Sequence, residues 1–179
     1  MIFEKNTIEG LVIIKPNVFE DKRGYFFESF RKDEFEKNVG NFDFIQDNQS
    51  FSSKNILRGL HFQKNPFAQG KLVRVIQGSV LDVAVDIRAN SPTYGQHFKV
   101  VLSGKNHLQF WVPPGFAHGF LTLSDYADIL YKCTDYYAPD DEGHLAWNDA
   151  DIAINWPLAQ NVMPILSDKD ANAKQSIHF

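Results

Sequence analysis

The chain has 179 residues, a formal net charge of −4 at pH 7, and 16 Phe, 6 Tyr and 3 Trp. A chain of this size can fold without disulfides or a structural metal, so we expect a single domain over 1–179, and the negative charge argues against non-specific nucleic-acid binding. Cys133 is the only cysteine, and the N-terminus lacks a signal-peptide pattern. No apolar run approaches the roughly 20 residues of a membrane span. Together these observations predict a cytoplasmic protein with no membrane partner.

Short runs of branched and aromatic residues predict strands along most of the chain. These runs are 10–19, 24–30, 71–76, 79–87, 97–102, 107–112, 119–123 and 128–137. A helical pattern covers 31–40, and Ser167 could cap a second short helix near the C-terminus with Asp170 in its first turn. Many short strands at about 8–12-residue spacing predict an all-β sandwich or barrel with these two helical additions.

The segment 57–75 combines cationic and apolar residues. It places Arg58, His61, Lys71 and Arg74 among apolar neighbours at strand-like spacing. Cations on a half-buried sheet face are costly unless an anionic or reactive group lies opposite them. The segment therefore predicts an electropositive pocket that contains a histidine. The alternative is a set of edge-strand charges beside an ordinary hydrogen-bonded core histidine.

A second motif, Pro-x-Gly-x-x-His, runs from Pro113 to His118 and resembles the second half of the cupin signature, which belongs to a jelly roll with its site inside the barrel. In metal-binding cupins the first half supplies a His-x-His pair, whereas this chain has His61 and then Gln63. Two histidines and an amide are a poor ligand set for divalent iron or zinc, so we expect no metal. The alternative for His118 is a turn residue bonded to the backbone.

A metal-free pocket with a histidine and a lysine suits removal of a proton next to a carbonyl group. His61 could act as a base near neutral pH, and Lys71 could stabilise the enolate oxygen. Inversion also requires a proton delivered from the opposite face. Tyr131 in the strand 128–137 is the candidate acid, and a core or rim tyrosine is its alternative.

Over nearly its full length the chain resembles the dTDP-4-dehydrorhamnose 3,5-epimerase family, which are cofactor-free sugar epimerases. The blocks that carry the resemblance include FEDKRGYFFESF (19–30), LRGLHFQ (57–63), QGKLVRVIQGSVLDVAVDIR (69–88), WVPPGFAHGFLTLSDYADILYKCTDYYAP (111–139) and ILSDKD (165–170). The resemblance implies a cupin-type jelly roll, or double-stranded β-helix. It also implies epimerisation of dTDP-4-dehydro-6-deoxy-D-glucose at C3 and C5 through enolates, which yields dTDP-4-dehydro-β-L-rhamnose for dTDP-L-rhamnose synthesis. The alternatives are a single-position C3 or C5 epimerase and an inactive cupin that binds a sugar nucleotide.

The resemblance assigns catalytic roles to four residues. His61 would remove the C3 and C5 protons, and Asp170 would hold its ring, with Asp168 as the rival for that position. Lys71 would stabilise the enolate at C4. Tyr131 would be the acid on the opposite face.

The resemblance also assigns a set of side chains to the substrate. His118 and Asp82 would line the sugar cavity. Two cations and two amides would bind the diphosphate and the sugar, namely Arg23, Arg58, Gln46 and Asn48. One acid and three aromatic rings would surround the thymine, namely Glu28, Phe19, Phe26 and Tyr137. On the residues alone, the acid at 28 could be a surface residue and the phenylalanines core residues. N-terminal strands in the family reach across to a partner subunit, which implies a homodimer in which 19–28 completes the neighbour's site.

Overall fold

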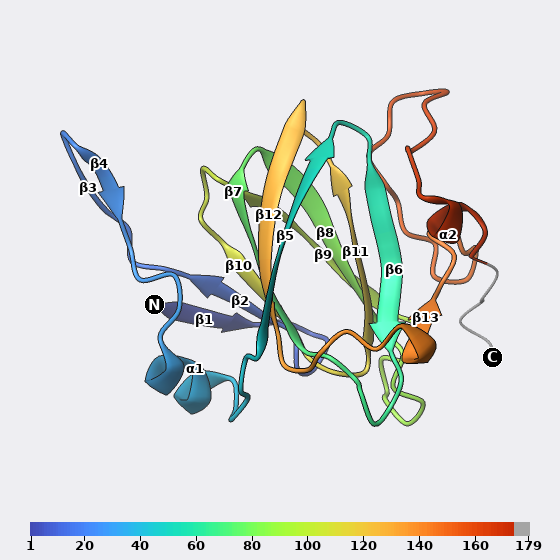
Figure 1. Ribbon diagram of the computed structural model, residues 1–179, viewed down its shortest axis with the longest axis horizontal. Helices are drawn as coiled ribbons and strands as arrows, with labels where there is room; N and C mark the ends of the chain where they lie inside the picture. The colour runs from blue at the N-terminus through green and yellow to red at the C-terminus, as the bar shows by residue number, and fades with distance from the viewer. Residues whose placement is uncertain (174–179) are drawn as a thin grey trace.

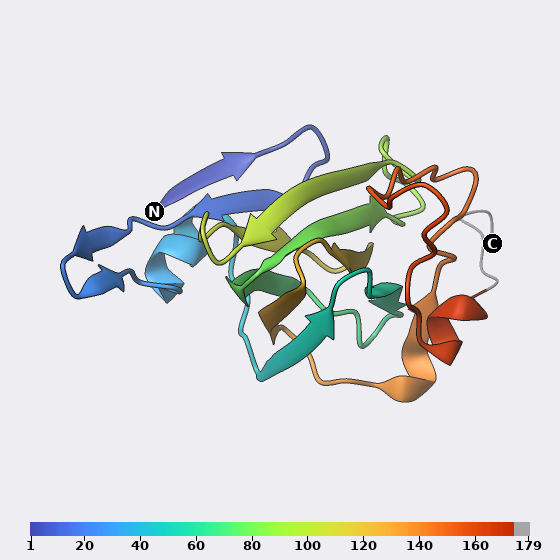
Figure 2. The same ribbon diagram turned by 90° about the horizontal axis from the view of Figure 1, so that it is seen from above.

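The computed structural model describes residues 1–173, and antiparallel strands dominate it (Figure 1). Two sheets face each other, and a two-stranded arm extends away from them (Figures 1 and 2). The six-stranded sheet contains, in spatial order, β1 (Ile2–Lys5), β2 (Val12–Lys15), β10 (Gln109–Val112), β7 (Lys71–Gln77), β12 (Tyr126–Cys133) and β5 (Gln46–Ser53). The five-stranded sheet contains β13 (Glu142–His144), β6 (Leu57–Gln63), β11 (Phe116–Thr122), β8 (Ser79–Asp86) and β9 (His97–Ser103).

The arm and the helices lie outside these sheets. The arm consists of β3 (Phe19–Asp21) and β4 (Gly24–Phe26), the helices are α1 (Lys32–Asn38) and α2 (Asp168–Ala171), and one 3-10 turn, η1, spans Pro139–Asp141. The Ser167 hydroxyl accepts a hydrogen bond from the Asp170 N–H at 3.2 Å, so the predicted cap of the C-terminal helix is confirmed. Within the described residues no helix is long and apolar enough to cross a membrane.

The prediction of an all-β fold with two short helices is confirmed, and each predicted strand overlaps an observed one. The strand β5 was missed because its sequence, QDNQSFSS, is polar throughout and shows no alternation of apolar and polar residues. Its side chains alternate in exposure, and a polar strand of this kind suits the edge of the sheet, where β5 lies. The strand β6 was not among the predicted runs because Gly59 interrupts its apolar pattern. The prediction of a strand over 24–30 was too long, since β4 ends at Phe26.

The strand β8 is buried on both faces. Val80 and Ala84 belong to the core cluster between the two sheets. Leu81 and Val83 face the other way and pack in a second cluster with Trp156 of the C-terminal segment. An aspartate, Asp82, therefore lies fully buried on the face directed between the sheets. Such a carboxylate needs a polar partner there.

Two glycines allow β6 and β11 to approach closely. A Cβ at Gly59 would lie 2.6 Å from the Gly119 Cα atom, and the φ of Gly59 is +131°. Both observations exclude a side chain at this crossing without local rearrangement. The close pairing sets His61 opposite His118 in the register of the two strands.

Candidate active site

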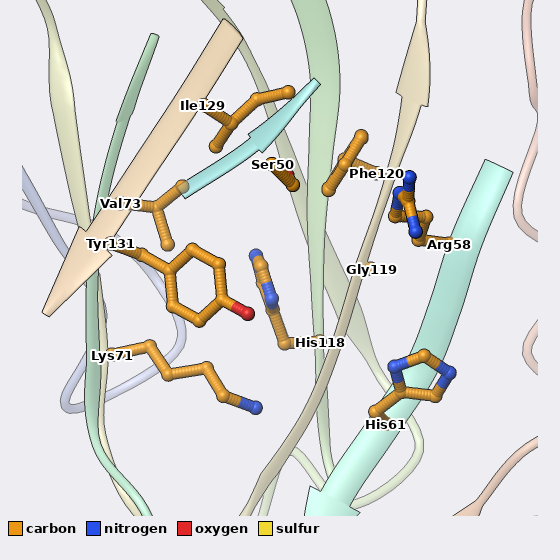
Figure 3. A pocket seen from close by; sticks show the side chains of 10 residues that line it. All are labelled: Ser50, Arg58, His61, Lys71, Val73, His118, Gly119, Phe120, Ile129 and Tyr131. Carbon is orange, nitrogen blue, oxygen red and sulfur yellow. The ribbon is translucent and has the colours of Figure 1, made fainter. Parts of the chain in front are cut away.

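A cavity of about 200 Å³ is lined by residues from both sheets (Figure 3). Arg58 and His61 of β6 and His118 of β11 line it on the five-stranded sheet, and Lys71 of β7 and Tyr131 of β12 line it on the six-stranded sheet. Figure 3 shows the Lys71 amine and the Tyr131 hydroxyl directed toward the histidines of the opposite wall. The structure thus brings together all the candidate residues for proton transfer.

The predicted pairing of His61 with an aspartate is resolved in favour of Asp170. The Asp170 Oδ1 atom lies 2.5 Å from His61 Nε2, whereas Asp168 is exposed. Burial by itself raises the pKa of Asp170, but hydrogen bonding and charge interaction with His61 and the Ser167 hydroxyl outweigh it and lower the pKa. Asp170 is therefore a carboxylate held against the ring, able to orient it and to stabilise its protonated form.

His118 forms a second pair of the same kind. Its Nε2 atom lies 2.7 Å from Oδ1 of the fully buried Asp82. This contact supplies the polar partner that the buried carboxylate requires. His118 lines the cavity as expected, whereas Asp82 does not line it and lies behind His118. The pairing replaces the alternative of a backbone-bonded turn histidine for His118.

Lys71 extends into the cavity from β7 (Figure 3). It keeps some contact with solvent through the cavity, but the surrounding protein still lowers its pKa by desolvation. The charges of Cys133, Glu142 and Asp82 act in the opposite direction. An ammonium group in such surroundings gains interaction energy when an anion forms beside it.

Tyr131 lies next to Lys71 on the neighbouring strand. Burial raises the pKa of its hydroxyl, with further contributions from the charges of Cys133 and Glu142 and an opposing one from Arg58. The hydroxyl therefore stays protonated at neutral pH. The Tyr131 hydroxyl, on the six-stranded sheet, thus faces the histidines of the five-stranded sheet across the cavity.

A second cavity of about 320 Å³ adjoins the first and shares His61, Lys71 and Tyr131 with it. Gln46, Asn48 and Tyr137, three residues expected at the nucleotide, line its other side. They are also linked to each other: Gln46 Nε2 donates to Asn48 Oδ1 at 3.0 Å, and Gln46 Oε1 accepts from the Tyr137 N–H at 3.0 Å. The two cavities therefore meet at the side chains of the candidate proton-transfer residues.

Two groups of predicted residues lie elsewhere. Arg74 points away from the cavity and lies over the Phe27 ring at 5.8 Å, so its placement in the electropositive pocket was wrong. Three arm residues expected at the nucleotide are exposed and do not line the His61 cavity of the same chain, namely Phe19, Arg23 and Phe26. The arm itself projects away from β6 (Figure 1). Glu28 follows the arm and lies 3.9 Å from Arg31 at the surface.

Sequence reasoning missed three residues beside the site. In β13 the Nε2 atom of His144 lies 3.2 Å from Oε2 of Glu142. The same oxygen accepts a hydrogen bond from Nζ of Lys169 in α2 at 2.8 Å. The His144 ring packs edge-on against His61 at a centroid distance of 4.9 Å. β13 has only three residues, which is too short for a periodic pattern, so no sequence signal marked it.

One group of side chains has the composition of a metal site. The ligand atoms of His61, His144 and Asp170 all lie within 4.8 Å of one another. In the structure His61 is paired with Asp170 and His144 with Glu142, so each histidine already has an acidic partner. Gln63, at the position expected for a cupin ligand, instead donates to the carbonyl oxygens of Phe67 and Tyr136.

The sequence profile that describes dTDP-4-dehydrorhamnose 3,5-epimerase matches residues 5–176. The chain is 55% identical over 174 residues to the dTDP-4-dehydrorhamnose 3,5-epimerase of Salmonella typhimurium, covering 97% of this chain and 94% of that one. It belongs to the dTDP-4-dehydrorhamnose 3,5-epimerase family. The family resemblance seen in the sequence blocks is confirmed.

Solved structures extend this similarity to the fold of the epimerase family. The Legionella pneumophila 3,5-epimerase, solved in complex with dTDP-4-keto-L-rhamnose, has a TM-score of 0.92 and 50% identity, with 96% of this chain and 90% of that chain covered. A 3'-monoepimerase from Streptomyces bikiniensis, in complex with dTDP-quinovose, has a TM-score of 0.89 and 34% identity, with 96% and 86% covered. The predicted cupin-like jelly roll is thereby confirmed.

Replacing Asp170 with Asn should lower the epimerase kcat by about 10²–10⁴-fold, because an amide cannot stabilise the protonated His61 ring and can hold the wrong tautomer. Asp168→Asn is the matched control in the same helix, and its kcat should stay within about twofold of wild type, as expected of an exposed position. Steady-state kinetics of the two variants measure this. Equal losses would remove the orienting role from Asp170.

Replacing Lys71 with Met should abolish epimerase activity and raise the free energy of unfolding by about 1–2 kcal/mol. The sign follows from the lowered pKa: below that pKa the buried ammonium opposes folding, and Met removes this cost. Urea unfolding at pH 7 measures the gain. Lys54→Met, at an exposed position, is the control and should change stability by less than about 1 kcal/mol. A destabilised Lys71→Met variant would contradict the prediction.

Proposed function

We propose that this chain, a single cupin-like epimerase domain, inverts C3 and C5 of dTDP-4-dehydro-6-deoxy-D-glucose with His61 as the base, Lys71 at the enolate oxygen and Tyr131 as the acid. One observation carries the proposal. The histidine and the tyrosine lie on opposite sheets and face one cavity (Figure 3). Inversion at carbon requires a proton to leave from one face and another to arrive at the other, and this arrangement supplies both.

The C4 carbonyl makes the hydrogens at C3 and C5 acidic, because the electron pair left by either proton delocalises onto the C4 oxygen. With Asp170 accepting from Nε2–H of His61, the other ring nitrogen is free of its proton and can take one from the sugar. The enolate oxygen then carries the negative charge, and the Lys71 ammonium stabilises it.

Tyr131 completes each step by donating its proton to the opposite face of the carbon. The histidine has gained one proton and the tyrosine has lost one, so the sugar is an isomer of what entered. Exchange with solvent restores both side chains before the next inversion. The same three residues serve both carbons, and no cofactor is needed for the balance of atoms or electrons.

The higher similarity to 3,5-epimerases supports double inversion. Identity is 55% to the Salmonella 3,5-epimerase and 34% to the Streptomyces 3'-monoepimerase. The hydroxyl of Tyr131 is available in the cavity to deliver a proton at either carbon, so the tyrosine by itself does not distinguish double from single inversion (Figure 3). Single-position epimerisation is the outcome that the following experiment would reveal.

In D₂O with a chelator present, the protein should introduce deuterium at both C3 and C5 of the dTDP-4-dehydro sugar, as followed by proton NMR. His61→Ala should abolish exchange and leave dTDP binding nearly unchanged, since the ring is expected to act on the sugar carbons. Tyr131→Phe should allow exchange without epimerised product, because the base remains and the acid is lost.

Label at a single carbon would assign the chain to the single-position epimerases. Absence of label, with the sugar nucleotide shown to bind, would leave a binding protein without epimerase activity. Activity lost on chelation would restore a metal at His61, His144 and Asp170, the group with suitable ligand spacing.

We further propose a homodimer whose arms complete each other's nucleotide sites. The arm formed by β3 and β4 exposes large aromatic side chains, with Phe19 65% and Phe26 68% exposed, and so has the character of an interface element. Arg23, at its tip, has a solvent-exposed guanidinium that is paired with Asp21 in this chain, and it could bind a diphosphate in bidentate fashion by exchanging that partner. The buried thiol of Cys133, the only cysteine, supports action in the reducing cytoplasm.

Mixing Arg23→Ala with His61→Ala protein should test this exchange. If arms cross, a mixed dimer contains one site with an intact arm and an intact base, and random reassembly restores about a quarter of the wild-type sites. Epimerase activity is measured below KM after joint unfolding and refolding. Activity equal to the mean of the separate variants would show that each arm serves its own chain.

A further inference from the structure

We propose that Ser52 is a positioning residue of the substrate site: its buried hydroxyl holds the Arg58 guanidinium in the orientation that receives the diphosphate. The inference rests on the proposed function, in which the substrate is a nucleotide sugar. Ser52 lies on β5 and Arg58 on β6, two strands that follow each other in the chain but belong to different sheets and do not pair. No predicted site residue included this serine.

The inward face of β5 is a row of polar side chains. Burial alternates along the strand, and the less exposed positions are Gln46, Asn48, Ser50 and Ser52. The first three line the two cavities that meet at the proton-transfer residues. Ser52 ends the row, is 1% exposed and is not among the described residues that line either cavity. Its hydroxyl can therefore act on the site only through a neighbouring side chain.

That neighbour is Arg58. Its Nε atom donates to Ser52 Oγ at 3.0 Å, and its Nη2 atom donates to the carbonyl oxygen of Phe51 at 3.3 Å. The two acceptors are adjacent in the chain and hold one edge of the planar guanidinium. An arginine has five N–H donors in a fixed fork, so two on Nη1 and one on Nη2 remain for a ligand.

Both acceptors are neutral, so they orient the guanidinium without cancelling its charge. Three of the five arginines pair with an aspartate instead, namely Arg23, Arg31 and Arg88. Arg58 lines the first cavity (Figure 3), and within residues 1–173 it forms no ion pair with an acid. Its charge reaches Tyr131, where it acts against the burial that raises the pKa of the hydroxyl.

A cation that is already oriented suits an anionic ligand in two ways. Its full charge is available for a bidentate contact with phosphate oxygens. Less side-chain freedom is lost on binding, because the bonds to Ser52 and Phe51 have restricted the arginine beforehand. The serine hydroxyl thus contributes to affinity for the diphosphate without touching it.

The test is calorimetric binding of dTDP to Ser52→Ala protein, with epimerase kcat and KM measured on the same sample. Loss of the hydroxyl should raise the Kd for dTDP and the KM for the sugar nucleotide by about 3- to 20-fold each. The kcat should stay within about twofold of wild type, because the proton-transfer residues keep their places. Ser53→Ala makes the same change at an exposed position of the same strand, and it should bind dTDP as wild type does.

A double-mutant cycle checks that the serine acts through the arginine. In the Arg58→Ala background, Ser52→Ala should add almost nothing to the loss of dTDP affinity. An unchanged Kd in Ser52→Ala, or equal losses in both backgrounds, would overturn the proposal. A lowered kcat at constant Kd would also overturn it, because the serine would then serve the chemical step and not the anion.

If Ser52→Ala protein fails to fold, Arg58→Lys decides, because lysine keeps the charge at this exposed position and lacks the fork that the serine holds. A raised Kd for dTDP supports the proposal, and an unchanged Kd refutes it. Binding of dTDP is measured without turnover. A wild-type protein that binds dTDP but shows no exchange at C3 or C5 would therefore refute the proposed epimerisation and not the role of Ser52.

Discussion

Two nearly inaccessible carboxylates, Asp82 and Asp170, each bind a histidine, and the arrangement of the site depends on these two pairs. A carboxylate removed from water is tolerated only with a charged or donating partner. The pairs meet because His61 and His118 are register partners on β6 and β11. The close approach at Gly59 and Gly119 thus fixes the position of the His61–Asp170 pair relative to the His118–Asp82 pair.

The two sheets contribute different chemistry. The five-stranded sheet presents the histidines with their carboxylates, whereas the six-stranded sheet presents an amine and a phenol whose pKa values are shifted in opposite directions by the same burial. A jelly roll whose sheets face each other can place a proton acceptor and a proton donor on either side of a sugar ring without any mobile element. The polar interior opposes stability, and the large apolar clusters on both sides of β8 offset this cost.

Much of the site was predictable from the sequence, because His61, Lys71 and Tyr131 occur in distinctive blocks and their chemistry is specific. The preference for Asp170 over Asp168 was correct, but it came only from the family resemblance. The residues alone could not decide it, because the choice depends on how a four-residue helix docks against His61, which is 109 residues away from Asp170 along the chain. The error at Arg74 was avoidable: it lies three residues from Lys71, and an odd spacing puts two side chains on opposite faces of one strand. Glu142 and His144 left no signal, since their place beside His61 comes only from the pairing of β13 with β6.

The shortness of α2 has a thermal consequence. The segment that supplies Asp170 is held by few contacts: the serine cap, the bond from Lys169, the contact of Asp170 with His61 and an isolated bridge between Ile56 and Ile165. Such a unit can open locally at a free energy well below that of unfolding the two sheets. On warming, activity is therefore expected to be lost at a temperature below the melting temperature of the two sheets.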